Sequence, residues 1–283
     1  AIVTGAPQDG FSQPYLSAVT YGSALYGLLA LVLAIDVTRR VFRVQAGAAA
    51  WAVWLGSPLI FYMYVAPGFS HAASAFAVSL FLWTWVRVRA TWTASGVMFL
   101  AVTAALLPMV REQDGFFVIA PALDFVAWAW RERVAGTRPL GALVQRAALG
   151  AFTAAVVYAP QALSYIALNG HLGPTRAVSR KMSWSSPHFF QVMASPEHGF
   201  FIWTPLALVA CGALAWHAWA RPASADRDRR WMAALFLLMV GLQVYVSGAV
   251  ESWTVAGSFG QRRFVGLTPI LVAGLARFAV IVV

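Results

Sequence analysis

Long apolar stretches alternate with short polar or charged segments along almost the whole chain. A helix of roughly 20 residues crosses a hydrocarbon core of about 30 Å, so the pattern predicts about nine membrane-spanning helices. The predicted spans are 15–37, 46–66, 71–86, 94–110, 116–130, 149–168, 200–219, 231–250 and 264–283. The stretches that begin at His71 and Phe116 are short for a crossing, so we expect them to be tilted, kinked or extended into a neighbouring loop.

The composition indicates the same class of protein. Of the 283 residues, 60% are hydrophobic and 11% are charged, whereas a soluble domain is usually about 25% charged. We therefore expect an all-α polytopic membrane protein that forms one domain over residues 1–283. Because the chain starts without methionine and ends in an apolar stretch, we also expect a fragment that is truncated at both ends.

The loops between the predicted spans form two sets that alternate along the chain. One set is rich in arginine and contains Arg39, Arg40, Arg43, Arg87, Arg89, Arg131, Arg133, Arg138, Arg221, Arg227, Arg229 and Arg230. By the positive-inside rule this set is cytoplasmic and the amino terminus is outside. Because topology accounts for most of the formal net charge of +10, we expect no nucleic-acid partner. The predicted location is an integral membrane one, with the other set of loops on the periplasmic or extracellular side.

The longest predicted outer loop, 169–198, contains an apolar segment at 186–195. Its apolar residues could cover one side of a short helix that lies along the membrane interface. We expect this helix to form a shelf over the outer ends of the spans.

Arg262 and Arg263 are the most informative residues of the outer set, because cations on this face do not serve to orient the protein. They follow small residues at 257–260, which let a ligand approach the backbone. A guanidinium group suits a phosphate, so the pair predicts a phosphate site. The alternative is that both arginines reach lipid head groups. Arg111 lies in a tight charged turn, where it can bind the same ligand, pair with Glu112 or Asp114, or do both.

His71 and His198 each begin a predicted span on the outer face, where a helix amino terminus favours anions. The alternative is a histidine at the level of the lipid head groups. No pair of histidines has a metal-ligand spacing, so we expect no metal site. The carboxylate of Asp124 lies inside a predicted span, and pairing with Arg131 is a sufficient explanation for it.

Most of the thirteen tryptophans fall at predicted inner span ends and indicate an aromatic belt at the interface. The predicted belt includes Trp83, Trp85, Trp128, Trp130, Trp216 and Trp219. By contrast, Trp184, Trp203 and Trp253 are placed to meet an outer ligand. Glu251 shares the outer loop of Trp253.

Five short motifs occur in an order that resembles a known group of enzymes. They are DGFS at 9–12, YMYVAPGFSH at 62–71, VREQD at 110–114, SPEHGFFIWTP at 195–205 and GSFGQRRF at 257–264. Together they resemble bacterial membrane glycosyltransferases of the C-type superfamily, which includes protein O-mannosyltransferases and aminoarabinose transferases. The resemblance implies an enzyme that moves a hexose or pentose from a polyprenyl-phosphate carrier to an acceptor on the outer side of the membrane.

The resemblance also implies roles for individual residues. The general base is an acidic residue in an external loop expected upstream of Ala1, so no catalytic residue is assigned and the fragment alone is expected to be inactive. Arg111, Arg262 and Arg263 would stabilise the leaving phosphate, and His71 and His198 would assist them. Glu251 and Trp253 complete the predicted substrate-binding set. No cofactor is expected, although some relatives use a divalent metal.

Two other functions are compatible with the same features. A surface-polysaccharide polymerase or ligase also faces outward and uses arginines on lipid-linked sugars. A transporter or flippase of lipid-linked sugars would instead have charged residues near mid-membrane and a repeat between its halves. Neither feature is clear in the sequence, so the pattern favours a transferase, with membrane lipid and a polyprenyl-phosphate sugar as its partners.

Overall fold

The computed structural model describes residues 5, 7–219, 227–255 and 257–282. Over these residues the structure is all-α, as predicted, with thirteen α-helices and two 3₁₀ helices. In chain order they are α1 (Gln13–Phe42), α2 (Gly47–Gly56), α3 (Leu59–Tyr64), α4 (His71–Val88), α5 (Ala94–Val110), η1 (Glu112–Val118), α6 (Ile119–Val134), α7 (Leu140–Asn169), α8 (Arg176–Arg180), α9 (Phe189–Ala194), α10 (Phe200–Trp203), α11 (Pro205–Trp219), α12 (Arg227–Gly248), η3 (Arg262–Leu267) and α13 (Thr268–Val282). Arg221 and Val283, which belong to the sequence predictions, lie outside the described residues.

Four described segments are long and apolar enough to cross a membrane. They are Gln13–Phe42, Leu140–Asn169, Arg227–Gly248 and Arg262–Val282. The helices α2, α5 and α11 are apolar but shorter. The structure thus supports membrane insertion of a helical protein, while the number of crossings stays a prediction.

Proline divides two of the predicted spans into separate helices. Proline lacks a backbone N–H and disfavours the helical conformation in the residue before it. Accordingly, Ser57 before Pro58 is extended and separates α2 from α3. Thr204 before Pro205 is also non-helical and separates α10 from α11. The predicted continuous helices over 46–66 and 200–219 were therefore wrong in detail.

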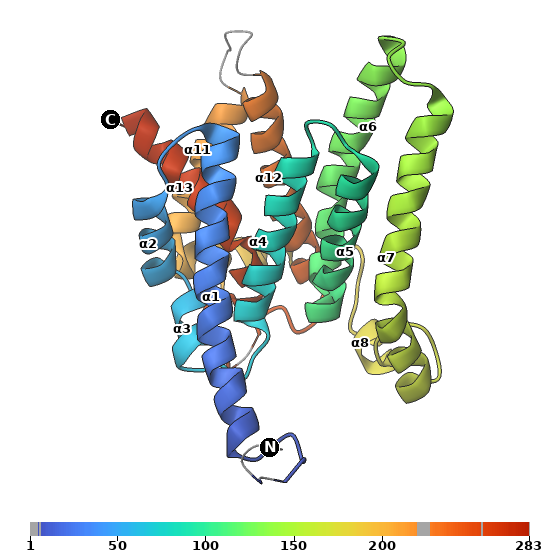
Figure 1. Ribbon diagram of the computed structural model, residues 1–283. Helices are drawn as coiled ribbons and strands as arrows, with labels where there is room; N and C mark the ends of the chain where they lie inside the picture. The colour runs from blue at the N-terminus through green and yellow to red at the C-terminus, as the bar shows by residue number, and fades with distance from the viewer. Residues whose placement is uncertain (1–4, 6, 220–226, 256, 283) are drawn as a thin grey trace.

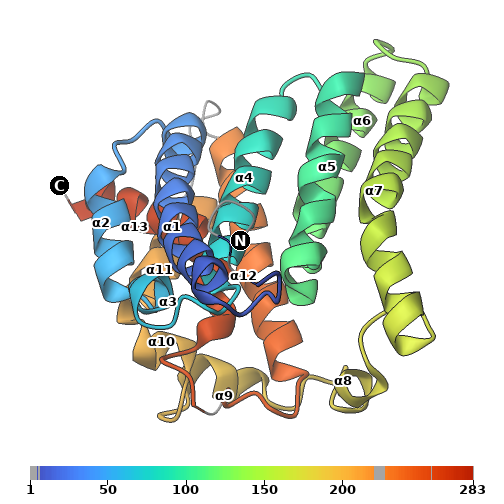
Figure 2. The same ribbon diagram turned by 60° about the horizontal axis from the view of Figure 1, so that its bottom comes forward.

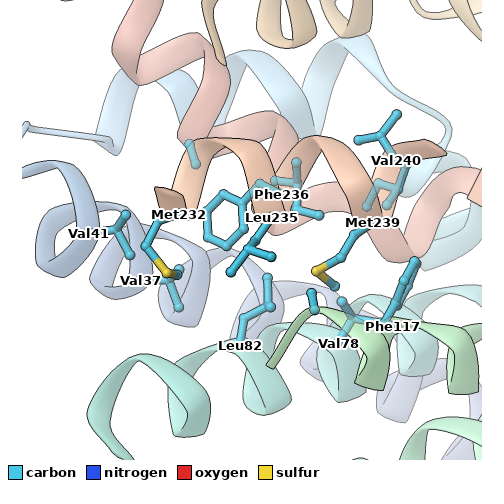
Figure 3. Close-up of a cluster of buried hydrophobic side chains, with 14 of the residues drawn as sticks. Val37, Val41, Val78, Leu82, Phe117, Met232, Leu235, Phe236, Met239 and Val240 are labelled. Carbon is cyan, nitrogen blue, oxygen red and sulfur yellow. The ribbon is translucent and has the colours of Figure 1, made fainter. Parts of the chain in front are cut away.

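The core forms around α12 (Figure 3). Five apolar side chains of this helix face α1, α4 and η1. They are Met232, Leu235, Phe236, Met239 and Val240, and their neighbours include Val37, Val41, Val78, Leu82 and Phe117. The helix α13 also packs closely on α11. A Cβ on Gly274 would lie only 2.4 Å from the carbonyl oxygen of Ala210, so a larger residue would not fit there. Small residues allow such close approach of helices.

The two sets of loops lie at opposite ends of the long helices. Figure 1 shows the α1–α2, α4–α5 and α6–α7 connections at one end, and the α3–α4 and α7–α8 connections at the other. The first end carries the described arginines of the arginine-rich set. We call it the basic end and the opposite one the outer end.

Asp124 ties the helices together near the basic end. It accepts hydrogen bonds from Arg89 Nε at 2.8 Å, from Trp85 Nε1 at 2.9 Å and from Trp231 Nε1 at 2.8 Å. Arg89 also pairs with Asp228 at 2.8 Å. Burial alone would lower the pKa of Arg89, but the hydrogen bonds that its guanidinium donates to Asp228 and Asp124 outweigh burial and raise the pKa.

This network corrects two predictions from the sequence. Asp124 pairs with Arg89 of the α4 end rather than with Arg131, whose Nε donates to the carbonyl oxygen of Ala127. Trp85 is fully buried in the core and does not belong to an interfacial belt. In both cases the partner comes from another helix, and contacts between helices are not visible in sequence spacing.

Candidate functional site

The site begins at the turn between α5 and η1, where four consecutive side chains reach four different partners. Arg111 has an extended backbone, with φ −152° and ψ 118°, so the chain changes direction there. The side-chain contacts are Arg111 with His71, Glu112 with Tyr165, Gln113 with the backbone of Arg263, and Asp114 with Ser74. The motif at 111–114 therefore links α4, α7 and η3 at the outer end.

The side chain of Arg111 is oriented by a hydrogen bond to His71. Its Nη1 lies 3.0 Å from His71 Nδ1, and because a guanidinium has no acceptor, the imidazole must accept this hydrogen bond in its neutral form. His71 is buried, with 4% of its surface exposed. Its place is thus to orient Arg111 rather than to meet a ligand directly. Burial lowers the pKa of Arg111 and the charge of Arg262 lowers it further, whereas Asp114 opposes the shift.

Asp114 is a buried carboxylate beneath this turn. Ser74 Oγ donates to its Oδ2 at 2.6 Å, and its Oδ1 has no hydrogen-bond partner among the described residues. Burial raises the pKa of Asp114, although the charge of Arg111 opposes the shift. A Cβ on Gly266 would lie 2.9 Å from Ser74 Oγ, so α4, η1 and η3 meet at this point. The structure shows no ion pair between the Arg111 side chain and Glu112 or Asp114. The Asp114 backbone N–H donates to the carbonyl oxygen of Arg111 at 2.9 Å, and the carboxylate of Asp114 acts on the guanidinium through its charge.

Arg262 and Arg263 diverge although they are adjacent. The Arg262 guanidinium lies over the ring of Phe69 at 5.3 Å. Arg263 instead reaches the end of α12, where its guanidinium donates to the carbonyl oxygen of Ser247 at 3.4 Å and to Oγ of Ser252 at 3.2 Å. The two arginines therefore do not present a joint surface to one ligand.

Two buried or half-buried amides fix the backbone of Arg263. Its carbonyl oxygen accepts from Gln113 Nε2 at 2.9 Å and from Gln243 Nε2 at 2.8 Å. Sequence reasoning missed Gln243, which lies in the apolar helix α12 with 1% of its surface exposed. An amide inside a predicted span was the available signal, because buried polar groups require partners.

A cavity of about 810 Å³ opens beside this turn, between the outer ends of α5, η1, α7 and α12 and the segment 174–184. Its volume falls in the range of small-molecule sites. Among its described lining residues, the basic side chains are Arg111, Lys181 and Arg263, and the acidic one is Glu112. Aromatic and apolar residues form the rest of its wall, including Met109, Val110, Phe116, Tyr165, Trp184 and Val246.

Short helices lie across the same end of the molecule. Figure 2 shows α8, α9 and α10 below the long helices, and Val178 and Ser179 of α8 line the cavity. The predicted short helix in 186–195 is present as α9, with Val192 buried. Its position at a membrane interface stays a prediction.

The remaining candidates lie outside the cavity. The ring of His198 stacks on Trp203 at 5.2 Å, and that of Trp253 stacks on His188 at 5.6 Å. Gln261 joins the two, because its Nε2 donates to the carbonyl oxygens of His198 and Trp253. Glu251 is exposed and its backbone N–H donates to the carbonyl oxygen of Lys181 at 2.8 Å.

Of the seven predicted binding residues, the structure therefore places Arg111 and Arg263 in one cavity and His71 directly behind Arg111. Sequence reasoning did not select Lys181 and Glu112, which also line this cavity. In the described part of the chain, no three His, Cys, Asp or Glu side chains gather in a possible metal site. Comparisons with protein-family models, curated proteins and solved structures give no match.

Proposed function

We propose that this protein is a membrane glycosyltransferase that moves a hexose or pentose from a polyprenyl-phosphate carrier to an acceptor on the outer face of a bacterial inner membrane. The observation that carries the proposal is the cavity at the outer end. Arg111, Lys181 and Arg263 line it together with one described carboxylate, Glu112. This excess of positive charge suits the phosphate of such a donor.

The surroundings of the cavity favour a lipid-linked substrate. Leu143 is the only fully buried residue of the 30-residue helix α7, so much of the apolar surface of this helix is exposed or half-buried. A second groove of about 320 Å³ lies between α5, η1 and α7, and alanines form half of its lining. Pro108 lines both spaces, so the groove adjoins the cationic cavity. A prenyl chain could occupy this apolar surface while its phosphate reaches the cations.

The distribution of charge favours an outward-facing site. The arginine-rich loops lie at the end of the long helices opposite the cavity. If that basic end is cytoplasmic, as the positive-inside rule predicts, the cavity opens to the periplasm. About nine crossings, as counted from the apolar pattern, belong to this proposal.

In the proposed reaction, the acceptor oxygen forms a bond to the sugar and the bond between the sugar and the phosphate oxygen breaks. Negative charge grows on the departing phosphate, and fixed cations nearby lower the barrier. Arg263 and Arg111 are suited to this role because their positions are set before a ligand binds, by two amides at the carbonyl of Arg263 and by His71 at Arg111. The acceptor proton passes to a general base, which the resemblance implies to be a carboxylate.

The proposal is tested with the full-length protein in sealed proteoliposomes that contain a polyprenyl-phosphate sugar labelled in the sugar. An extract of envelope material is supplied as the source of acceptors. We expect the wild type to transfer single sugars to an acceptor and to release free polyprenyl phosphate. Arg263→Ala is expected to abolish the transfer and the release. Growth of long sugar chains would instead indicate a polymerase or ligase. Movement of intact donor between leaflets without transfer would indicate a flippase and contradict the proposal.

A further inference from the structure

Two chemically different groups of side chains line the cavity. Arg111, Lys181 and Arg263 supply its positive charge. The second group comprises Glu112 and the aromatic residues Phe116, Tyr165 and Trp184. A sugar phosphate has the same division, since its phosphate is anionic and its ring combines hydroxyl groups with apolar C–H faces.

Glu112 is held away from the cations of its own cavity. Its Oε1 accepts a hydrogen bond from the Tyr165 hydroxyl of α7, and within the described residues it makes no ion pair with Arg111, Lys181 or Arg263. The side chain is exposed, and no described group donates to its Oε2. Its carboxylate therefore keeps acceptor capacity for hydroxyl groups of a ligand, and hydrogen bonds to a charged acceptor are among the stronger ones.

Trp184 is positioned before a ligand arrives. The residue is 53% exposed, and its ring lies 6.0 Å from the ring of Phe116. Its carbonyl oxygen accepts from the Tyr245 hydroxyl of α12, and the neighbouring Ser183 N–H donates to the carbonyl oxygen of Ala249 at 2.7 Å. An exposed aromatic face on an anchored backbone offers apolar contact area at small entropic cost.

We infer that Glu112, Tyr165 and Trp184 form the subsite for the sugar ring of the donor, next to the cations that bind its phosphate. The inference rests on the proposed function. A single bond joins sugar and phosphate in such a donor, so the ring must lie beside Arg111 and Arg263, where these three side chains are found. Glu112 and Tyr165 bind ring hydroxyls, and Trp184 covers a C–H face. A site that bonds hydroxyls discriminates against ligands that lack them.

The test compares two ligands, polyprenyl phosphate and the same carrier bearing its sugar, for binding to the full-length protein in nanodiscs. We expect three variants to weaken binding of the glycosylated carrier about 10-fold: Glu112→Gln, Tyr165→Phe and Trp184→Ala. Each should change the affinity for the bare carrier by less than about 2-fold. Arg263→Ala is expected to weaken binding of both ligands by the same factor. Glu197→Gln, which changes an exposed carboxylate outside the cavity, should leave both affinities at the wild-type value.

The outcomes separate the inference from the proposed function. If Arg263→Ala loses both ligands but the Glu112 and Trp184 variants keep the wild-type ratio of affinities, the sugar subsite is wrong and the phosphate site stands. Equal weakening of both ligands by Glu112→Gln would also overturn the subsite. If folded wild-type protein binds neither ligand, the proposed function and the subsite fail together. Trp184→Phe, which keeps an aromatic face, replaces Trp184→Ala if the alanine variant does not fold.

Discussion

At the scale of single residues, adjacent side chains with the same charge have different surroundings. Arg262 lies over Phe69, whereas Arg263 lines the cavity. The basic pair in the sequence indicated phosphate chemistry, but it could not distinguish its two members. Their directions depend on how η3 turns, and that turn is fixed by Gln113 and Gln243 from distant parts of the chain.

Gln243→Leu tests this positioning. The substitution keeps the size of a buried side chain but removes one of the two amide donors to the carbonyl of Arg263. We expect it to weaken binding of a polyprenyl-phosphate sugar about 3- to 10-fold and to lower the free energy of unfolding by about 1 kcal/mol. Gln191→Leu is the matched control because Gln191 is exposed on α9. Unchanged affinity in the Gln243 variant would show that Arg263 does not depend on this bond.

At the scale of helices, the sequence indicated which segments are helical better than it indicated where they end or what they contact. The apolar stretch 46–66 contains Pro58, and Pro205 lies within 200–219, so both breaks had a visible cause. The partner of Asp124 had no such signal. Arg131 lies two turns away on the same helix, but Arg89 comes from the end of α4 and meets Asp124 only because the helices pack together.

This difference gives a prediction about stability. Arg89→Leu leaves the buried carboxylate of Asp124 without its charged partner, so we expect the free energy of unfolding to fall by about 3–5 kcal/mol. Arg131→Leu removes an exposed side chain on the same helix as Asp124, and it should change the free energy of unfolding by less than about 0.5 kcal/mol. Denaturant unfolding in detergent measures both variants. Equal losses would mean that Arg89 does not have the special role that the network gives it.

At the scale of the whole molecule, apolar pattern and loop charge were sufficient to predict an all-α protein with segments of membrane-crossing length, which the structure bears out. They also sorted the loops into two sets, and these lie at opposite ends of the long helices. The cavity could not be predicted from the sequence. It forms where the ends of α5, α7 and α12 meet the segment 174–184, so its residues are separated by up to about half of the chain. Lys181 and Glu112 therefore stood out only in the structure.

The most direct measurement of the central claim is the equilibrium binding of a polyprenyl-phosphate sugar to the full-length protein in nanodiscs. Wild type is compared with Arg263→Ala, which changes the cavity, and with Arg262→Ala, which changes its neighbour over Phe69. We predict saturable binding by wild type, a loss of about 10- to 100-fold in affinity for Arg263→Ala and a much smaller loss for Arg262→Ala. Absence of binding by folded wild type, or equal affinities of the wild type and the Arg263 variant, would contradict a phosphate site in this cavity.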